Sequence, residues 1–291
     1  MYPPAFDYAV PRSLDEALDL LAEVGDEGRV LAGGQSLIPM MKLRLAAPAH
    51  LVDINEISEL SYIREVNGHL AIGALTRHAD VVRSEIVGAG CSTMASAAPW
   101  VADPLVRNRG TVCGSVAHCD PEGDWNSVML ALGAEVVARS RTGERVIPIS
   151  DFVVDFFTNA LEPGEMVTEL RVPRDDERSG GCYLKLERKI GDYATVGVAA
   201  HLRLDERGRI GRAGLALTSV APVNLEVEEA ERMMAGQEPS EELFAEAAEI
   251  AARTCQPQSD VRGPAEYKRA VVRAYTRRAL HQALATARGE R

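Results

Sequence analysis

The stretch Arg29-Val30-Leu31-Ala32-Gly33-Gly34-Gln35-Ser36 is the point from which the fold of this chain can be worked out. Its apolar start and its two glycines are followed by a second apolar run at residues 37–41, which predicts a strand, a tight turn and another core element. Glycine adopts positive φ without steric cost and lets another backbone or a ligand approach closely. Free N–H groups in such a turn, extended by the Ser36 hydroxyl, form an anion site. An ordinary turn between two core strands is the alternative.

Length, composition and charge limit the classes of protein to which the chain can belong. The 291 residues are 46% apolar and 26% charged, which predicts a globular protein of about two domains. The net charge of −11 argues against nucleic acid or an anionic membrane as a partner, since both need a basic surface. No apolar run reaches the ~18 residues of a transmembrane helix, and the N-terminus lacks the pattern of a secretory signal. We therefore expect no transmembrane segment and a cytoplasmic protein.

The cysteines and histidines form no recognisable metal or catalytic motif. The five cysteines are scattered and include no C-x-x-C pair, so neither zinc nor an iron–sulfur cluster is expected in this chain. Reduced, buried thiols are expected instead. The six histidines occur in no Ser-His-Asp or H-E-x-x-H context, and we expect core or surface roles for them.

Local signals divide the first 175 residues into two units. The capping box Ser13-Leu14-Asp15-Glu16 begins a helix that ends at Gly25, and with the apolar run at residues 51–54 it predicts a small sheet-and-helix unit over residues 1–56. In the second unit, residues 57–175, a mainly helical segment is expected at 80–102. One hairpin is expected at Asn67-Gly68, between strands at residues 62–66 and 69–72. A second hairpin is expected at Thr142-Gly143, between strands at residues 135–139 and 145–149. A further strand is expected at residues 166–172.

A charged and then glycine-rich segment, residues 174–181, is the predicted flexible domain boundary. It separates a first domain, residues 1–175, from a second domain, residues 176–291. Three strands are expected first in the second domain, at residues 182–189, 195–204 and 210–220. Three helices are expected after them, at residues 225–235, 240–254 and 264–287. This order predicts an α+β fold, with a three-stranded antiparallel sheet plus a three-helix bundle. The basic residues of the last helix are expected to form a solvated face, with a partner surface as the alternative: Lys268, Arg269, Arg273, Arg277, Arg278 and Arg288.

A second glycine- and serine-bearing stretch, Thr111-Val112-Cys113-Gly114-Ser115, strengthens the interpretation of residues 29–36 as an anion site. Two such turns in one domain can converge on a diphosphate and offer N–H donors from both sides. Neither turn contains the Gly-Lys-Ser/Thr of a Walker A loop, and neither matches G-x-G-x-x-G. Phosphoryl transfer and ordinary nicotinamide binding are therefore disfavoured.

Four segments, taken in their order and spacing, resemble a known family: residues 32–36 (Ala-Gly-Gly-Gln-Ser), 107–115 (Arg-Asn-Arg-Gly-Thr-Val-Cys-Gly-Ser), 120–124 (Asp-Pro-Glu-Gly-Asp) and 188–194 (Arg-Lys-Ile-Gly-Asp-Tyr-Ala). The family is that of the FAD-binding medium subunits of molybdenum hydroxylases, and the chain most resembles the medium chains of aerobic carbon monoxide dehydrogenases. Xanthine dehydrogenases carry the same domain inside a longer chain. The resemblance extends over nearly the whole sequence, including residues 262–267 (Arg-Gly-Pro-Ala-Glu-Tyr).

The resemblance implies a fold and an FAD site. The fold is a two-part FAD-binding domain of the vanillyl-alcohol-oxidase/PCMH type, with subdomains 1–56 and 57–175, followed by a C-terminal domain like that of carbon monoxide dehydrogenase flavoproteins. Residues 29–36 and 111–115 match the family's two diphosphate loops. Further positions match cofactor contacts: Asp124 at the ribose or adenine end, Val101 and Val167 as apolar contacts, Lys185 near the flavin ring, and Tyr193 close to the isoalloxazine face, where it would control access.

The residues themselves leave other roles open. Asp124 could cap a helix that starts at residue 125 or 126, Lys185 could be an exposed strand lysine, and Tyr193 could be a core tyrosine with its hydroxyl at the rim. Cys113 and Cys119 are too few ligands for a metal, and buried thiols are expected instead. Cys113 also stands where relatives usually have glycine, which predicts a second loop that is tighter or less able to adopt positive φ.

The resemblance also implies a place in an electron-transfer chain, with no catalytic residue in this chain. In the family a large partner with a molybdenum–pterin centre oxidises the substrate, and a small partner relays electrons through two [2Fe–2S] clusters. A dimer of heterotrimers is expected, in which the FAD passes electrons to an external acceptor such as a quinone, NAD or oxygen. The substrate stays open between carbon monoxide, an aldehyde and an N-heterocycle, because its pocket lies on another chain. Rival functions are a self-contained FAD-dependent oxidase and a nucleotide-binding scaffold subunit with no redox role.

Overall fold

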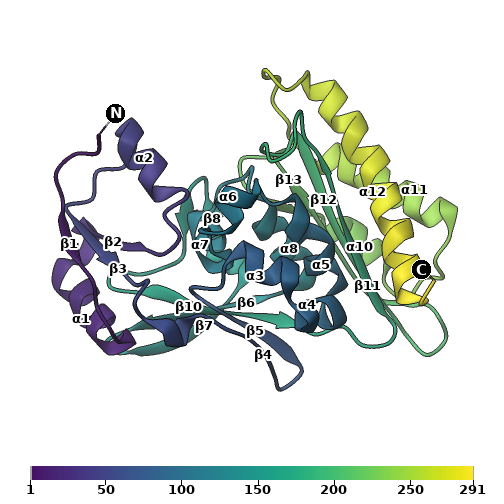
Figure 1. Cartoon of the computed structure of the whole chain (residues 1–291). Helices are drawn as coiled ribbons and strands as arrows, with labels where there is room; N and C mark the ends of the chain where they lie inside the picture. Colours follow the sequence, from purple (N-terminus) through teal and green to yellow (C-terminus); the bar gives the residue numbers. More distant parts are fainter. Residues whose placement is uncertain (1, 291) are drawn as a thin grey trace.

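The N-terminal unit is a three-stranded parallel sheet with a helix packed against it (Figure 1). In the computed structural model, which describes residues 2–290, β3 (His50–Asp53) lies between β1 (Asp7–Ala9) and β2 (Gly28–Leu31) and runs parallel to both. The other elements of the unit are α1 (Leu14–Val24), the 3-10 turn η1 (Gly25–Glu27) and α2 (Leu37–Leu43). The Ser13 hydroxyl accepts a hydrogen bond from the Glu16 N–H, 3.2 Å away, so the predicted helix start is confirmed. The reciprocal half of the predicted capping box is not formed as expected, because the Glu16 carboxylate accepts the Arg12 N–H at 2.7 Å.

The second unit is built on a five-stranded antiparallel sheet in the order β4-β5-β10-β6-β7. Its strands are β4 (Ile63–Val66), β5 (His69–Gly73), β6 (Glu135–Ser140), β7 (Gly143–Pro148) and β10 (Met166–Pro173). Asn67 and Gly68 have φ of 50° and 81°, as a type I′ hairpin turn requires. Both predicted hairpins and the strand at 166–172 are therefore confirmed.

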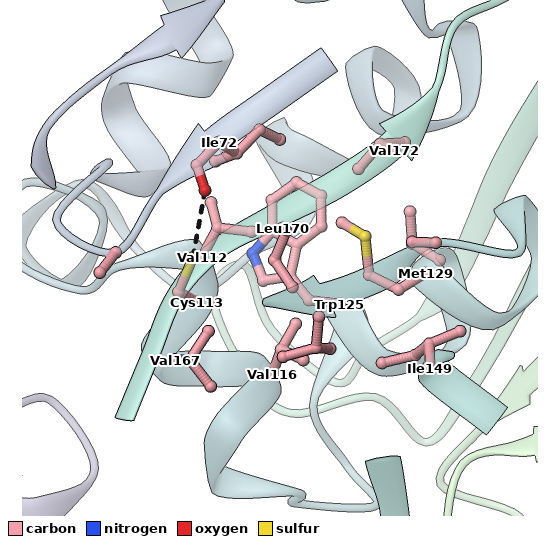
Figure 2. Close-up of a cluster of buried hydrophobic side chains, with 14 of the residues drawn as sticks. Ile72, Val112, Cys113, Val116, Trp125, Met129, Ile149, Val167, Leu170 and Val172 are labelled. Atoms are coloured by element: carbon pink, nitrogen blue, oxygen red, sulfur yellow. Dashed lines mark hydrogen bonds between the residues drawn. The ribbon is translucent and has the colours of Figure 1, made fainter. Parts of the chain in front are cut away.

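Short helices precede and connect these strands, and the mainly helical segment expected at residues 80–102 is confirmed. They are η2 (Ser58–Leu60), α3 (His78–Arg83), α4 (Glu85–Gly90), α5 (Ser92–Ala97), η3 (Ala98–Trp100), α6 (Pro104–Arg107), α7 (Val112–His118), α8 (Asp124–Leu132) and α9 (Ile149–Phe152). A small ladder is formed by β8 (Val153–Asp155) and β9 (Thr158–Asn159). Figure 2 shows the Trp125 indole of α8 surrounded by apolar side chains of α7, β5 and β10. This core holds the helices against the sheet.

The C-terminal part is an antiparallel sheet in the order β11-β12-β13-β14, followed by three helices. The elements are β11 (Ser179–Leu186), β12 (Val196–Leu204), β13 (Ile210–Thr218), β14 (Leu225–Glu226), α10 (Glu228–Met234), α11 (Glu241–Thr254) and α12 (Ala265–Ala287). The prediction of three strands was wrong by one. Leu225 and Glu226 do not begin a helix, because they pair with Leu217 and Ala216 of β13 and extend the sheet.

The glycines at the predicted boundary are not flexible. Gly180 and Gly181 lie inside β11, which begins at Ser179 rather than at residue 182. A Cβ on Gly180 would lie 2.3 Å from the backbone nitrogen of Ala287 in α12, and one on Gly181 would lie 1.8 Å from Thr93 Oγ1 in α5. Glycine is needed here because helices pack closely on both faces of the strand. The boundary at residue 175 stays a prediction.

The two parts share an interface made by α5 and α8. Helix α8 packs against β10 of the first sheet and against β12 and β13 of the second, and α5 packs against β11. The opposite face of the second sheet is covered by α12, with α11 beside it (Figure 1). No helix of the described chain is long and apolar enough to cross a membrane.

The basic residues of α12 do not form one solvated face. Arg273 and Arg277 are exposed and pair with Glu249 and Glu241 of α11. Lys268 is buried, however, and its Nζ lies 2.7 Å from Asp260 Oδ2. The expectation of a solvated face was therefore wrong for Lys268, which helps to anchor the loop before the helix.

Burial of Glu231 on α10 makes the stability of the C-terminal part dependent on pH. Burial raises the pKa of Glu231 from 4.5 to about 7, with Glu226 adding to the shift and Arg212 opposing it. Folding therefore favours the protonated form, and the stability that this form contributes is lost as the pH rises through the folded-state pKa. Glu231→Gln keeps an oxygen to accept the Leu215 N–H. We expect this variant to show a flatter decrease in the free energy of unfolding between about pH 5 and pH 7, measured by urea denaturation. Parallel profiles for variant and wild type would contradict it.

Candidate functional site

The glycine stretch after β2 is held against a second loop of the first domain. Gly34 has φ of 71°, which places it in the left-handed region. A Cβ on Gly33 would lie 2.4 Å from the carbonyl oxygen of Arg109 and 2.7 Å from Gly110 Cα. Because these are backbone atoms, the two loops can meet this closely only if residue 33 is glycine. The first predicted segment thus meets residues 109–110, which directly precede the second predicted segment at residues 111–115.

The first loop offers donors that are not used within the protein. Within residues 2–290, the backbone N–H groups of residues 33–36 have no hydrogen-bond acceptor. The same loop leads into the N-terminus of α2, where the helix dipole is positive. This set of donors fits an anionic group such as a diphosphate.

The second segment is a helix start rather than a turn. Thr111 caps α7, and its hydroxyl accepts the Gly114 N–H at 3.1 Å. The expected effect of Cys113 on a loop was therefore wrong, because the residue is helical and needs no positive φ. Its thiol points into the core, where Sγ lies 3.4 Å from the carbonyl oxygen of Ile72 (Figure 2). All five cysteines are buried and free. Val112 is also in the core and donates its N–H to the carbonyl oxygen of Thr76.

A cleft of about 1330 Å³ runs past both segments. Small-ligand pockets are usually about 300–1000 Å³, so this cleft can admit a molecule of dinucleotide size. Of the residues predicted to bind FAD, Val112 alone does not line it. The lining predicted residues are Arg29, Val30, Leu31, Ala32, Gly33, Gly34, Gln35, Ser36, Val101, Thr111, Cys113, Gly114, Ser115, Asp124, Val167, Lys185 and Tyr193.

Arg77 and Asn55 fasten the two loops together, and sequence reasoning did not find them. Arg77 Nη1 donates to the carbonyl oxygen of Arg109 and Nη2 to Asn55 Oδ1, both at 2.5 Å. Asn55 Nδ2 in turn donates to the carbonyl oxygen of Ala32 at 2.7 Å. No local pattern marks the pair, because its members come from segments that are separate in the sequence.

Replacing Arg77 with lysine is expected to weaken FAD binding about 10-fold. A guanidinium can reach two acceptors at once, whereas an ammonium acts as a point charge and keeps one of them. Losing one hydrogen bond to a charged group costs about 1.5–3 kcal/mol, part of which is recovered by water. A fluorescence titration with FAD measures the effect, with Arg83→Lys on the exposed side of α3 as the matched control. Equal affinities for the two variants would contradict this role of Arg77.

Asp124 and Lys185 form a buried ion pair across the interface of the two parts. Asp124 Oδ2 lies 3.0 Å from Lys185 Nζ, and Oδ1 accepts the Tyr183 hydroxyl at 2.6 Å. Lys185 Nζ also donates to the carbonyl oxygen of Trp100 at 3.0 Å. Burial raises the pKa of Asp124, and the Lys185 ammonium opposes this shift. The alternatives of a helix cap for Asp124 and an exposed lysine at 185 are therefore wrong: Gly123 is the cap of α8, and Lys185 is buried.

Tyr193 lies at the mouth of the cleft, in the connection between β11 and β12. It is 50% exposed, so it is not a core tyrosine. The Arg262 guanidinium lies 5.9 Å from the centre of its ring, and Arg262 Nη1 lies 2.5 Å from Glu122 Oε1. Burial of part of the side chain and the nearby Asp120 carboxyl group raise the pKa of Tyr193. The arrangement places an aromatic ring beside the opening.

The family model described as the FAD binding domain in molybdopterin dehydrogenase matches residues 4–175, which is more than half of the chain. The chain belongs to this family. The model described as the CO dehydrogenase flavoprotein C-terminal domain matches residues 181–283. The resemblance seen in the sequence and the expected two-part α+β fold are thereby confirmed, as is FAD as the cofactor of the first domain.

Relatives match over the whole length of this FAD-binding chain. It is 41% identical over 285 residues to the carbon monoxide dehydrogenase medium chain of Hydrogenophaga pseudoflava, covering 98% of this chain and 99% of that one. It is 40% identical over 288 residues to the 6-hydroxypseudooxynicotine dehydrogenase complex subunit alpha of Paenarthrobacter nicotinovorans, covering 99% and 97%. A solved carbon monoxide dehydrogenase from Hydrogenophaga pseudoflava, which lacks the Mo-pyranopterin moiety of its molybdenum cofactor, matches with a TM-score of 0.94 and 42% identity, covering 98% of this chain and 99% of that chain. This chain is thus an oxidoreductase subunit.

Metal ligands are not grouped in the part of the chain that the structure describes. Within residues 2–290, no cluster of three or more histidine, cysteine, aspartate or glutamate side chains is placed to hold a metal ion.

Proposed function

We propose that this chain is the FAD-carrying electron-transfer subunit of a molybdenum hydroxylase, which receives electrons from the [2Fe–2S] clusters of a small partner subunit and passes them to an external acceptor. A large molybdenum–pterin subunit would oxidise the substrate. The observation that carries the proposal is the close contact of Gly33 with residues 109–110, beside four unused N–H donors in a chain of this family. This contact supports a site for the diphosphate of FAD.

The proposed roles of the lining residues follow their places in the cleft. Residues 29–36 and 111–115 would surround the diphosphate, although Val112 would act only by supporting α7 from the core. Asp124 would hold the ribose or adenine end, and Val101 and Val167, which are nearly buried in the wall of the cleft, would contact the rings. Lys185 Nζ lies 3.0 Å from Asp124 Oδ2, so both residues would serve the same part of the cofactor, and Lys185 cannot lie near the flavin ring while Asp124 holds the adenine end. Tyr193 would lie at the exposed face of the flavin. The flavin itself, when bound, supplies the redox chemistry that links one-electron donors to a two-electron acceptor.

The proposed assembly is a heterotrimer that forms a dimer, located in the cytoplasm. Substrate choice is not assigned to this chain, because relatives of nearly equal identity are named for carbon monoxide and for 6-hydroxypseudooxynicotine. The chain is proposed to serve the same step in either setting, because the substrate pocket is expected on the large molybdenum–pterin subunit.

A visible spectrum of the complex, isolated from its host through a tag on this chain, tests the proposal. We expect flavin and iron–sulfur absorbance, bleached together when a substrate of the complex is added without oxygen. A flavin spectrum that is bleached by substrate in the isolated chain would favour a self-contained oxidase. A colourless protein that stays colourless after FAD is added would favour the scaffold.

A further inference from the structure

His78 is a buried residue beside the cleft for which the sequence predicted only a core or surface role. It is the first residue of α3 and is 5% exposed. Its backbone N–H donates to the carbonyl oxygen of Gly110, which fixes α3 against the second loop. His78 is one of the residues that line the cleft. A polar side chain that is this deeply buried normally has partners for both ring nitrogens.

One ring nitrogen of His78 has a partner that determines the tautomer. The Trp125 indole nitrogen lies 3.0 Å from His78 Nδ1. An indole N–H can only donate, so Nδ1 must be the unprotonated acceptor. Burial, aided by the charges of Arg107 and Arg77, lowers the pKa of His78 to about 4, so the ring is neutral at neutral pH. A neutral imidazole with an unprotonated Nδ1 carries its proton on Nε2.

The other nitrogen points to the place where the two loops meet. A Cβ on Gly110 would lie 2.8 Å from His78 Nε2, and a Cβ on Gly33 would lie 2.7 Å from Gly110 Cα. Gly110 therefore lies between His78 Nε2 and Gly33 where the two loops meet. Over the described range, 2–290, Nε2 has no hydrogen-bond acceptor in the protein. It is a donor at the loop contact, and Gly110 separates it from Gly33, where the residues with unused N–H groups begin.

The charge around His78 selects the kind of acceptor. Arg77 and Arg107 are close enough to disfavour its protonation, so the surroundings are positive. A positive site with several N–H donors favours an anionic oxygen over a neutral carbonyl. The phosphate oxygens of FAD are anionic in every redox state, whereas the ring of oxidised flavin offers only neutral carbonyl oxygens and ring nitrogens.

We propose that His78 is a further binding residue of this site, and that its Nε2–H donates a hydrogen bond to a phosphate oxygen of the diphosphate bound between the two loops. The inference rests on the proposed FAD site and adds a residue to it. The Trp125 indole is assigned a positioning role, because it holds the imidazole in the tautomer that donates toward the cleft.

The test uses the full chain, freed of flavin, and two ligands that share the diphosphate, FAD and ADP. His78→Phe keeps a ring and removes the donor, and we expect it to weaken both ligands about 10- to 100-fold by isothermal titration calorimetry. His78→Gln, which supplies an amide donor, is expected to recover part of the loss. His69→Phe is the matched control, because His69 does not line the cleft. Unchanged affinity of His78→Phe for ADP would overturn the inference.

A second measurement does not depend on the folding of a variant. In wild-type chain labelled with ¹⁵N-histidine, the His78 spectrum is expected to show protonated Nε2 and unprotonated Nδ1, and the Nε2–H resonance is expected to move when ADP binds. The opposite tautomer, or a resonance that does not move when ADP is bound, would overturn the inference. Failure of wild-type chain to bind either ligand would instead contradict the proposed FAD site itself.

Discussion

Replacing Gly33 with alanine is expected to weaken FAD binding by at least about 100-fold, which corresponds to about 2.7 kcal/mol. The added Cβ would meet the Arg109 carbonyl oxygen and Gly110 Cα at 2.4 and 2.7 Å. Neither atom belongs to a flexible side chain, so one loop must move away from the other. Such a movement separates the unused N–H groups of residues 33–36 from the second loop. Equilibrium titration with FAD, followed by flavin fluorescence, gives the affinity.

Gly88→Ala is the matched control for this variant. It makes the same chemical change within α4, and a Cβ there would meet no atom within 4 Å. It is expected to leave FAD binding unchanged and to keep or slightly raise the stability, since alanine is favoured in helices by about 1 kcal/mol over glycine. Wild-type FAD affinity in Gly33→Ala would show that the contact of the two loops does not form the site.

Replacing Lys185 with methionine is expected to lower the free energy of unfolding by about 3–5 kcal/mol. The side chains of Lys185 and Asp124 are 1% and 6% exposed, so removal of the ammonium leaves a carboxylate buried without its counter-charge. The Trp100 carbonyl oxygen also loses a donor. Both losses fall at the interface of the two parts of the chain, so we expect the unfolding of both parts to be affected. Urea denaturation followed by circular dichroism measures the change.

Two further variants separate this effect from a general loss of packing. Asp124→Asn in the Lys185→Met background removes the nearer of the two carboxylates beside Lys185 and is expected to recover part of the lost stability. The Glu187 carboxylate, whose Oε2 lies 3.7 Å from Lys185 Nζ, remains. Arg277→Met, which breaks the exposed pair with Glu241, is expected to cause no measurable change. A double variant that is as unstable as Lys185→Met alone would contradict the assignment of the effect to the buried charge.

The sequence predicted the elements whose signals are local. Asn67-Gly68 predicted a hairpin because these two residue types tolerate the positive φ that both central positions of a type I′ turn require. The structure shows positive φ at both residues. Ser13 and Ser240 marked helix starts because a side-chain oxygen satisfies an N–H that the helix leaves free. The order of strands and helices was sufficient to predict an α+β C-terminal part.

The features that the sequence did not predict depend on contacts between distant segments. Gly180 and Gly181 were interpreted as flexible because sequence pattern does not distinguish freedom from close packing, and α5 and α12 meet them only in the fold. The contact of Arg77 with Asn55 arises in the same way. Lys185 in particular could not be recognised as buried without its partner Asp124. For the candidate site, the loops were found from their composition, whereas the groups that hold the loops together required the structure.

The flavin content of the chain, purified with its partners, is the most direct test of the central claim that two converging loops form an FAD site. Cofactor released by denaturation is identified and quantified by chromatography against the protein concentration. We predict one FAD per chain. FMN in place of FAD, which lacks the second phosphate and the adenine, or no flavin after incubation with excess FAD, would contradict the account.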